Sequence, residues 1–156
     1  MQLSLHADYG CRVLIYLALL EGDARASIEQ VAGAYGISEN HLVKVVHQLG
    51  RHGFVDTLRG RGGGIRLARP AAEIRLGEVV RAMEPHFNMV ECFAPETNTC
   101  PIISTCGLKR VLVDATAAYL AKLDEASIAD VLRDQRGLRR ALEIDTRTVD
   151  PVGVDC

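Results

Sequence analysis

Tryptophan is absent from this sequence, and only three phenylalanines and four tyrosines occur among its 156 residues. The hydrophobic residues, 48% of the chain, must therefore build a core mostly from aliphatic side chains. A core of this kind favours helices over extended sheets. The length suits one ordinary domain, or a small domain with an appendage, that buries a core without disulfides.

We also expect neither a membrane-spanning segment nor a secretory leader in this sequence. The apolar stretch near the start, Val13 to Leu20, is too short to cross a bilayer. Asp8 and Arg12 precede this stretch, and no small-residue cleavage site follows it. We therefore expect a cytoplasmic protein, in which thiols stay reduced and clustered cysteines are more often metal or redox ligands than disulfide partners.

A strong net charge is missing as well, because 18 basic and 20 acidic residues leave a formal charge of -2. General attraction to polyanions is thus not expected of the whole chain. The charge is unevenly distributed, however: between residues 39 and 69, six basic residues and three histidines accompany two acidic residues. A local basic patch in an acidic protein indicates a specific nucleic-acid contact surface, the alternative being an ordinary solvated surface.

The sequence from 27 to 51 predicts a helix-turn-helix. Ser27 and Gln30 form a capping-box pattern that opens a short helix ending near Tyr35, and Gly36 follows it. A second helix, capped by Ser38, carries an apolar stripe at helical spacing and a polar outer face. The residues of this region that we expect to contact DNA are Ser38, Asn40, His41 and Lys44.

A glycine-rich hairpin follows, with β-prone segments at 54–58 and 65–68 on either side of a run of arginines and glycines. We interpret it as the wing of a winged helix-turn-helix, in which Arg59 and Arg61 reach phosphates or the minor groove. Gly62 and Gly63 would let the backbone turn and approach DNA closely. A phosphate-binding P-loop would need a Lys-Ser or Lys-Thr pair, which is not present, and a plain exposed hairpin is the remaining alternative.

Further helices are predicted at about 4–20, 74–83, 107–123, 127–133 and 138–144, with an irregular loop from 84 to 106. The helix at 107–123 carries a broad apolar face that another surface must cover. The expected architecture is therefore mainly α. A winged helix-turn-helix spans 1–83, a cysteine loop 84–106, C-terminal helices 107–145, and a disordered tail 146–156.

Three of the five cysteines lie in the loop, at positions 92, 100 and 106. No Cys-x-x-Cys pair occurs, whereas structural zinc sites normally use such close pairs and four ligands. Separated thiolates favour an iron–sulfur cluster, with zinc, thiol redox chemistry and unrelated cysteines as alternatives. Cys11 is expected to be a small buried hydrophobe and Cys156 an incidental residue of the tail. No base lies at catalytic spacing from a cysteine, so an enzyme is not expected.

Four stretches in fixed order carry a resemblance to a known family: LVKVVHQLG, RGRGGGIRLARPAAEI, LGEVVRAMEP and VECFAPETNTCPIISTCGLK. Together they resemble the winged-helix iron–sulfur regulators of the NsrR, IscR and RirA type. The resemblance implies a homodimeric repressor that binds double-stranded DNA at a palindromic promoter operator, with Cys92, Cys100 and Cys106 holding the cluster. It also implies a fourth ligand from the first helix of the partner subunit, where Asp8 occupies the matching position. The implied dimer interface lies on the long helix at Leu108, Val111, Leu112, Ala115 and Tyr119.

The branches of this family differ in their fourth ligand and their signal. An IscR-like site would have a histidine three residues after the last cysteine, where this chain has Lys109, and His86 lacks motif support as a substitute. The nitric-oxide-sensitive NsrR branch matches best, with iron or redox sensing as the alternative and a zinc-organised interaction module as a rival from another class. Three thiolates and one oxygen leave one distinct iron, which favours a 4Fe–4S over a 2Fe–2S cluster and offers nitric oxide a binding position.

Overall fold

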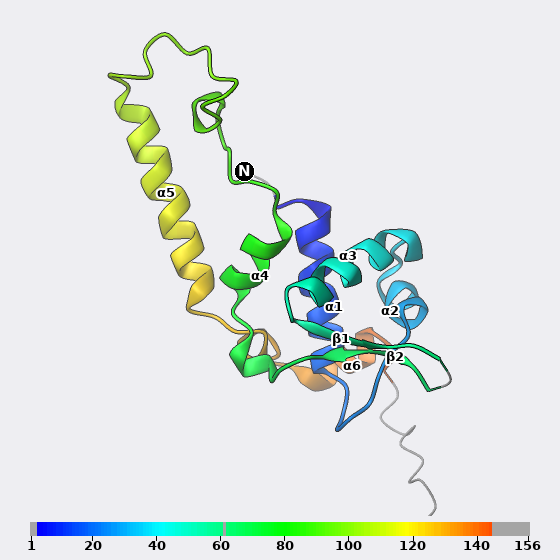
Figure 1. The fold of residues 1–156 in the computed structure, drawn as a ribbon. Helices are drawn as coiled ribbons and strands as arrows, with labels where there is room; N and C mark the ends of the chain where they lie inside the picture. Colours follow the sequence, from blue (N-terminus) through cyan, green and yellow to red (C-terminus); the bar gives the residue numbers. More distant parts are fainter. Residues whose placement is uncertain (1–2, 61, 145–156) are drawn as a thin grey trace, which may run out of the picture.

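The computed structural model describes residues 3–60 and 62–144. Its α-helices are α1 (Leu5–Ala18), α2 (Ile28–Tyr35), α3 (Glu39–Arg51), α4 (Leu76–Met83), α5 (Gly107–Asp124) and α6 (Gln135–Ala141). Strands β1 (Val55–Leu58) and β2 (Gly64–Leu67) pair as an antiparallel hairpin between α3 and α4 (Figure 1). Short 3-10 turns occur at η1 (Ala71–Glu73), η2 (Glu91–Phe93) and η3 (Ala129–Val131). This is the order of elements of a winged helix-turn-helix, as the sequence predicted.

α1 lies at the centre of the main body, where it packs against α3, α4 and β2. The core around it is mostly aliphatic, as the composition required, and its two buried aromatic side chains among the described residues are Tyr16 and Phe54. Fully burying a leucine or phenylalanine side chain stabilises the fold by roughly 1.5–3 kcal/mol. The largest fully buried side chains include Leu14, Leu19, Leu42, Leu49 and Phe54.

The capping box predicted for α2 is present. The Gln30 N–H donates to Ser27 Oγ at 3.0 Å, and the Ser27 N–H donates to Gln30 Oε1 at 2.7 Å. Gly36 ends the helix with a φ of 63°, in the left-handed region that favours glycine. The position and length of α2 are therefore decided locally.

α3 buries the predicted apolar stripe, and this fixes which of its faces points outward. Ser38 holds the N-cap position, but its side chain accepts no hydrogen bond from the helix, so the prediction of a side-chain cap is corrected. The Ser38 hydroxyl is exposed instead. The stripe consists of Leu42, Val45, Val46 and Leu49.

The segments after α5 return to the same core. Ile128, Leu132 and Leu142 are buried in one cluster with α1 and the hairpin. The helix predicted over 127–133 is reduced to the turn η3, and the hydroxyl of Ser127, which precedes this turn, donates to Asp130 Oδ2 at 2.6 Å. The chain leaves the helical conformation at Leu132, where ψ is 43°, and this side chain is buried in the core. Tertiary burial has overridden the local helix signal.

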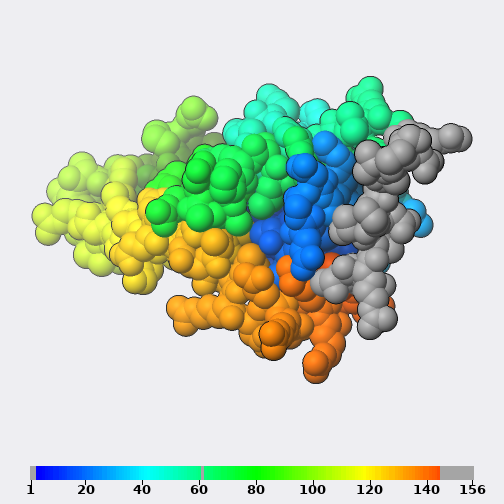
Figure 2. Space-filling model, turned by 90° about the horizontal axis from the view of Figure 1, so that it is seen from below, coloured from blue at the N-terminus to red at the C-terminus, as the bar shows by residue number. Residues whose placement is uncertain are grey.

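α5 extends away from this body (Figure 1), and Figure 2 shows its yellow segment projecting from the rest of the molecule. Within the described part of the chain, Thr116 is the one buried side chain of α5. At the base of the helix, the Arg81 guanidinium of α4 donates to both carboxylate oxygens of Asp124 at 2.6 Å. These hydrogen bonds lower the pKa of Asp124. Among the described residues, no helix combines the length and apolarity needed to cross a membrane.

Candidate functional site

The outward face of α3 carries the side chains that the sequence assigned to DNA contact. Asn40, His41 and Lys44 are all exposed. Val43 is also exposed, at 47%, and was not among the predicted contacts. Successive residues of a helix are rotated by about 100°, so Val43 could have been assigned to the outer face from its position next to the buried Leu42. An exposed apolar side chain on such a face can contact a thymine methyl group.

The hairpin tip is shaped by its glycines. Gly60 and Gly62 have φ values of 92° and 73°. A Cβ atom added to Gly63 would lie 2.4 Å from the Leu58 carbonyl oxygen, so no side chain fits there. Arg59 is exposed at the start of the tip. Arg61, the second predicted arginine, lies outside the described residues.

The hairpin is attached to the main body by a short backbone bridge. The Ile65 N–H donates to the Ala26 carbonyl at 2.8 Å, and the Ala26 N–H donates to the Ile65 carbonyl at 3.0 Å. Ala26 lies directly before the cap of α2, so this bridge sets where the hairpin lies relative to the helix-turn-helix. The wing and α3 are therefore held by one framework.

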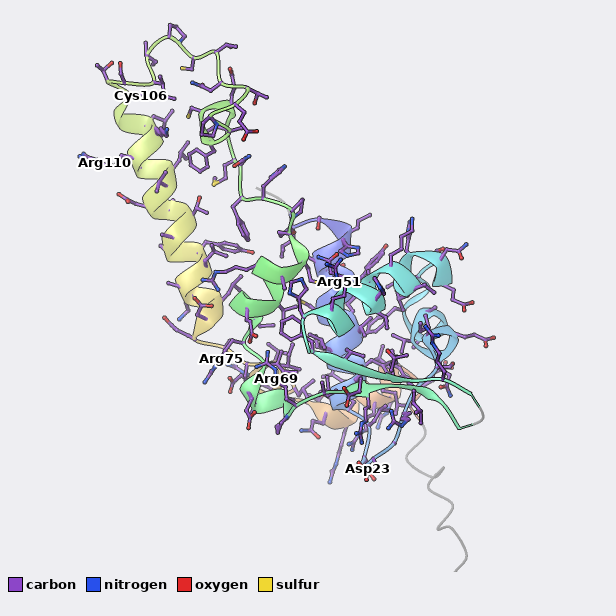
Figure 3. The ribbon with its side chains drawn as sticks, in the orientation of Figure 1. Asp23, Arg51, Arg69, Arg75, Cys106 and Arg110 are labelled. Carbon is purple, nitrogen blue, oxygen red and sulfur yellow. The ribbon has the colours of Figure 1, made fainter. Side chains whose placement is uncertain are left out.

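The three loop cysteines are free thiols of intermediate burial. Cys92 lies in η2, and Cys106 is the N-cap residue of α5. Figure 3 shows Cys106 at the outer end of α5, away from the winged-helix body. The Cys100 N–H donates to Asn98 Oδ1 at 3.2 Å.

Hydrogen bonds within the loop give it local order. The Thr99 N–H and hydroxyl both donate to Glu91 Oε1, at 2.5 and 2.7 Å. The hydroxyl bond, followed by the backbone bond, lowers the pKa of the Glu91 carboxyl. The loop therefore has a defined path although most of it lies on the surface.

Within residues 3–60 and 62–144, no three histidine, cysteine, aspartate or glutamate side chains come close enough to hold a metal ion. The structure of one chain thus does not bring the predicted ligands together. The donor set does fit an iron–sulfur cluster, because Cys92, Cys100 and Cys106 supply three unpaired thiols with no competing disulfide among them.

Asp8 lies in the first turn of α1, where its carboxylate pairs with Arg12 at 2.8 Å. The Arg12 guanidinium also lies 5.9 and 5.8 Å from the ring centroids of Tyr9 and Tyr35. The Asp8 and Arg12 side chains are 38% and 43% exposed, and a pair this accessible contributes roughly 0–1 kcal/mol. Asp8 can therefore leave Arg12 for another partner at small cost. Arg12 was not among the predicted site residues, although its i,i+4 spacing from Asp8 on a helix is typical of an ion pair.

Cys11 differs from the loop cysteines because it packs against the core. Burial, with a smaller effect from Asp8, raises the pKa of the Cys11 thiol to about 11. Removing the thiol proton, which metal binding requires, is therefore harder than for an ordinary cysteine. This agrees with the prediction of a small hydrophobic residue.

The face of α5 that the sequence assigned to an interface is largely bare. Leu108 and Val111 are 62% and 59% exposed on this face. A contiguous exposed apolar surface marks an interaction site more often than an ordinary monomer surface. Of the other predicted interface residues, Ala115 is exposed while Leu112 and Tyr119 are half-buried.

Comparison with known proteins gives the family. The Rrf2 family model, described as an iron-dependent transcriptional regulator, matches residues 3–134. The chain is 46% identical over 144 residues to the HTH-type transcriptional regulator NsrR of Bacillus subtilis (strain 168), covering 92% of this chain and 99% of that protein. It is 47% identical over 146 residues to the HTH-type transcriptional regulator NsrR of Shouchella clausii (strain KSM-K16), covering 94% and 98%.

Solved structures agree with the fold. Oxidized CymR of Staphylococcus aureus matches with a TM-score of 0.67 at 26% identity, covering 85% of this chain and 97% of that one. T. potens IscR matches with a TM-score of 0.70 at 24% identity, covering 89% and 91%. The mainly α winged-helix fold and the resemblance to NsrR are thereby confirmed, and the protein is a regulator rather than an enzyme. This chain belongs to the Rrf2 family of transcriptional regulators.

Proposed function

We propose that this chain is a homodimeric repressor whose affinity for a palindromic promoter operator is controlled by an iron–sulfur cluster that senses nitric oxide. The observation that carries the proposal is the loop with three free thiols at the head of a bare apolar helix. Its relatives named NsrR and the iron-dependent description of its family support it. A regulator acts on DNA in the cytoplasm, where the thiols stay reduced.

In this proposal residues 1–83 contact DNA, 84–106 bind the cluster and 107–145 join the subunits. Three aliphatic side chains near the head of α5 are about half exposed: Ile102, Leu108 and Val111. Covering both copies of all three would contribute on the order of 6 kcal/mol, which lies within the range of about 4–15 kcal/mol that association costs. A stable pair therefore also needs the rest of the face, including Leu112, Ala115 and Tyr119.

Asp8 of the partner subunit would complete the ligand set of Cys92, Cys100 and Cys106. When bound, a 4Fe–4S cluster would supply one iron with an exchangeable oxygen ligand, where nitric oxide can bind. Asp8 would then leave Arg12 and connect the first helix of one subunit to the loop of the other. This connection would fix the spacing of the two α3 helices, which must match half-sites about 34 Å apart. Release of Asp8 would remove the constraint and lower the affinity for the operator.

The DNA contacts divide by chemistry. Asn40 and His41 can hydrogen-bond to base edges in the major groove. Lys44 and the wing arginines, Arg59 and Arg61, would contact phosphates, which position the protein without reading sequence. The remaining assigned contacts are the Ser38 hydroxyl and the backbone at Gly62 and Gly63.

Anaerobic gel-shift titrations of cluster-loaded and metal-free protein on a palindromic promoter fragment test the proposal. Loaded protein should bind more tightly, and nitric oxide should weaken it to the level of the metal-free form. Equal affinity in all states would contradict the sensor function. A colourless protein with stoichiometric zinc, in place of a brown one with iron and sulfide, would contradict the cluster.

Asp8→Ala tests the fourth ligand. It should change the visible spectrum of the loaded protein and the course of a nitric oxide titration. Asp23→Ala is the matched control, because Asp23 is an exposed carboxylate at the opposite end of the molecule from Cys106 (Figure 3). If both variants behave like the wild type, Asp8 is not a ligand.

Iron is the second candidate for the signal, because the family description is that of an iron-dependent regulator. In that case chelation of iron would release the operator, and nitric oxide at stoichiometric amounts would leave the complex intact. The same titrations with a chelator added separate the two signals.

A further inference from the structure

We propose that Gln48 of α3 is a positioning residue that links the first helix to the recognition helix. The inference rests on the proposed function and deepens it, because it concerns how occupancy of the cysteine site reaches the DNA-reading face. Neither the apolar stripe of α3 nor its DNA-contacting face includes Gln48.

One amide side chain bridges three helices at this point. The Gln48 amide nitrogen donates to the Ala82 carbonyl oxygen of α4 at 2.6 Å, and Gln48 Oε1 lies 2.8 Å from His6 Nε2 of α1. A carbonyl oxygen can only accept, so the amide nitrogen must face Ala82 and the amide oxygen must face His6. His6 Nε2 is therefore the donor, and the chain of contacts has a fixed direction.

Both ends of this bridge lie beside the proposed sensor. His6 is two residues before Asp8 on α1, and Ala82 is two residues before Glu84, where the cysteine loop begins. A second tie joins the same segments, because the Ser4 N–H donates to Glu84 Oε1 at 2.7 Å. The start of α1, the end of α4 and the second half of α3 are thus held together at one place.

Directional contacts can specify a position that apolar packing cannot. The buried side chains between α1 and α3 tolerate small sliding movements, since the hydrophobic effect has no direction. A hydrogen bond weakens steeply when its angle or length changes. Movement of α1 when Asp8 changes partner would therefore reach α3 through His6 and Gln48, and would tilt the helix that carries Asn40 and His41.

The measurable quantity is the ratio of the operator Kd of metal-free protein to that of cluster-loaded protein. Coupling between sites typically changes affinity by roughly 5–150-fold. Gln48→Leu keeps a side chain of similar size but removes both hydrogen bonds, so this ratio should fall toward one. The visible spectrum and the iron and sulfide content should not change, because Gln48 is not a ligand.

Lys44→Ala is the matched control on the same helix. It removes a proposed phosphate contact, so both Kd values should rise by a similar factor and their ratio should stay at the wild-type value. A Gln48→Leu protein that retains the wild-type ratio would overturn the proposal. So would a variant whose ratio falls only because its cluster is lost.

His6→Leu breaks the bridge from the other side without altering α3. It decides the question if circular dichroism shows that Gln48→Leu does not fold, and it should give the same loss of coupling. If the wild type itself shows a ratio of one, the proposed sensor function fails and this inference fails with it. If the wild type shows coupling and both variants keep it, the proposed function stands and the Gln48 link alone is rejected.

Discussion

Asp8 and Cys11 lie three residues apart on α1, yet their surroundings give them opposite properties. The Asp8 carboxylate is accessible and its pairing with Arg12 is weak, so it can change partners. The Cys11 thiol packs against the core, and burial raises its pKa to about 11. Sequence alone would rank a cysteine above an aspartate as an iron ligand, whereas burial reverses that order.

Cys11 should react slowly with iodoacetamide in metal-free protein. Raising the pKa from 9.0 to about 11 lowers the thiolate fraction at pH 8 about 100-fold, and only the thiolate is a nucleophile. Its labelling rate, followed by mass spectrometry of peptides, should rise about tenfold per pH unit up to the pKa. Labelling as fast as that of Cys92, Cys100 and Cys106 would contradict the burial, and urea-unfolded protein provides the control.

The raised pKa of Cys11 also makes the stability of the fold depend on pH. The protonated thiol stabilises the folded state below the unfolded pKa near 9, and this contribution is lost as pH rises through the folded value of about 11.

The contacts of single residues show where sequence reasoning succeeds. The buried stripe of α3 was predictable because helical periodicity is a local property. The partners of Gln48 were not, because His6 and Ala82 lie 42 and 34 residues away on other helices. A glutamine at the edge of an apolar stripe gives no local sign of which neighbours it will find.

Among the helices, α2 shows how local signals fix an element. Gly33 lies inside it with nothing within 4 Å of an added Cβ, whereas Gly36 ends it at a φ of 63°. Gly33→Ala should raise the free energy of unfolding by roughly 0.5–1 kcal/mol, because alanine loses less backbone entropy on folding. Gly36→Ala should lower it by roughly 1 kcal/mol, because the left-handed conformation is strained for alanine. Urea unfolding of both variants measures the difference, and equal shifts would contradict the observed helix end.

The face of α5 gives the test of assembly. Leu108→Asp combined with Val111→Asp should convert the dimer into a monomer in sedimentation velocity, since charges in an apolar contact are costly to bury. Val131→Asp is the control, because this valine of η3 is 39% exposed outside the proposed interface. A double variant that sediments like the wild type would exclude this face as the interface.

The short turn η3 shows that the length of a helix could not be predicted from its local sequence. Ser127 and Asp130 make the hydrogen bonds of a helix cap, but Ile128 and Leu132 are buried in the main core and the helix stops. A capping pattern reports where a helix can begin, whereas its length depends on what the following residues pack against.

At the scale of the whole molecule, the net charge is small and the basic residues are unevenly distributed. The formal charge is -2, so operator binding must rely on a few basic side chains on one face. Arg59→Ala should reduce the slope of log Kd against log salt concentration by about 2, from about 0.9 per phosphate contact in each of two subunits. Arg110→Ala is the control, since Arg110 lies on α5 away from the wing and α3 (Figure 3). An unchanged slope for Arg59→Ala would remove the wing from the DNA interface.

The fold could be predicted from one chain, but the geometry of the site could not. The helix-turn-helix, the wing and the apolar helix follow from local patterns of glycines, caps and periodicity, whereas the last helix begins at Gln135 and not at the predicted residue 138. The three cysteines share a loop, yet among the described residues no set of ligands converges within a single chain. If the fourth ligand belongs to a second copy, a pattern along one sequence carries no information on how the copies meet.

If α5 joins two subunits as proposed, this helix has a genetic consequence. A subunit with an intact α5 and a damaged α3 would then still pair with normal subunits, and each mixed dimer would read one half-site instead of two. When both forms are made in equal amounts, random pairing would place half of the normal subunits in such pairs, and only a quarter of the dimers would be fully normal. Loss of DNA reading in one gene copy should therefore be dominant over a functional copy, whereas loss of the α5 face should be recessive.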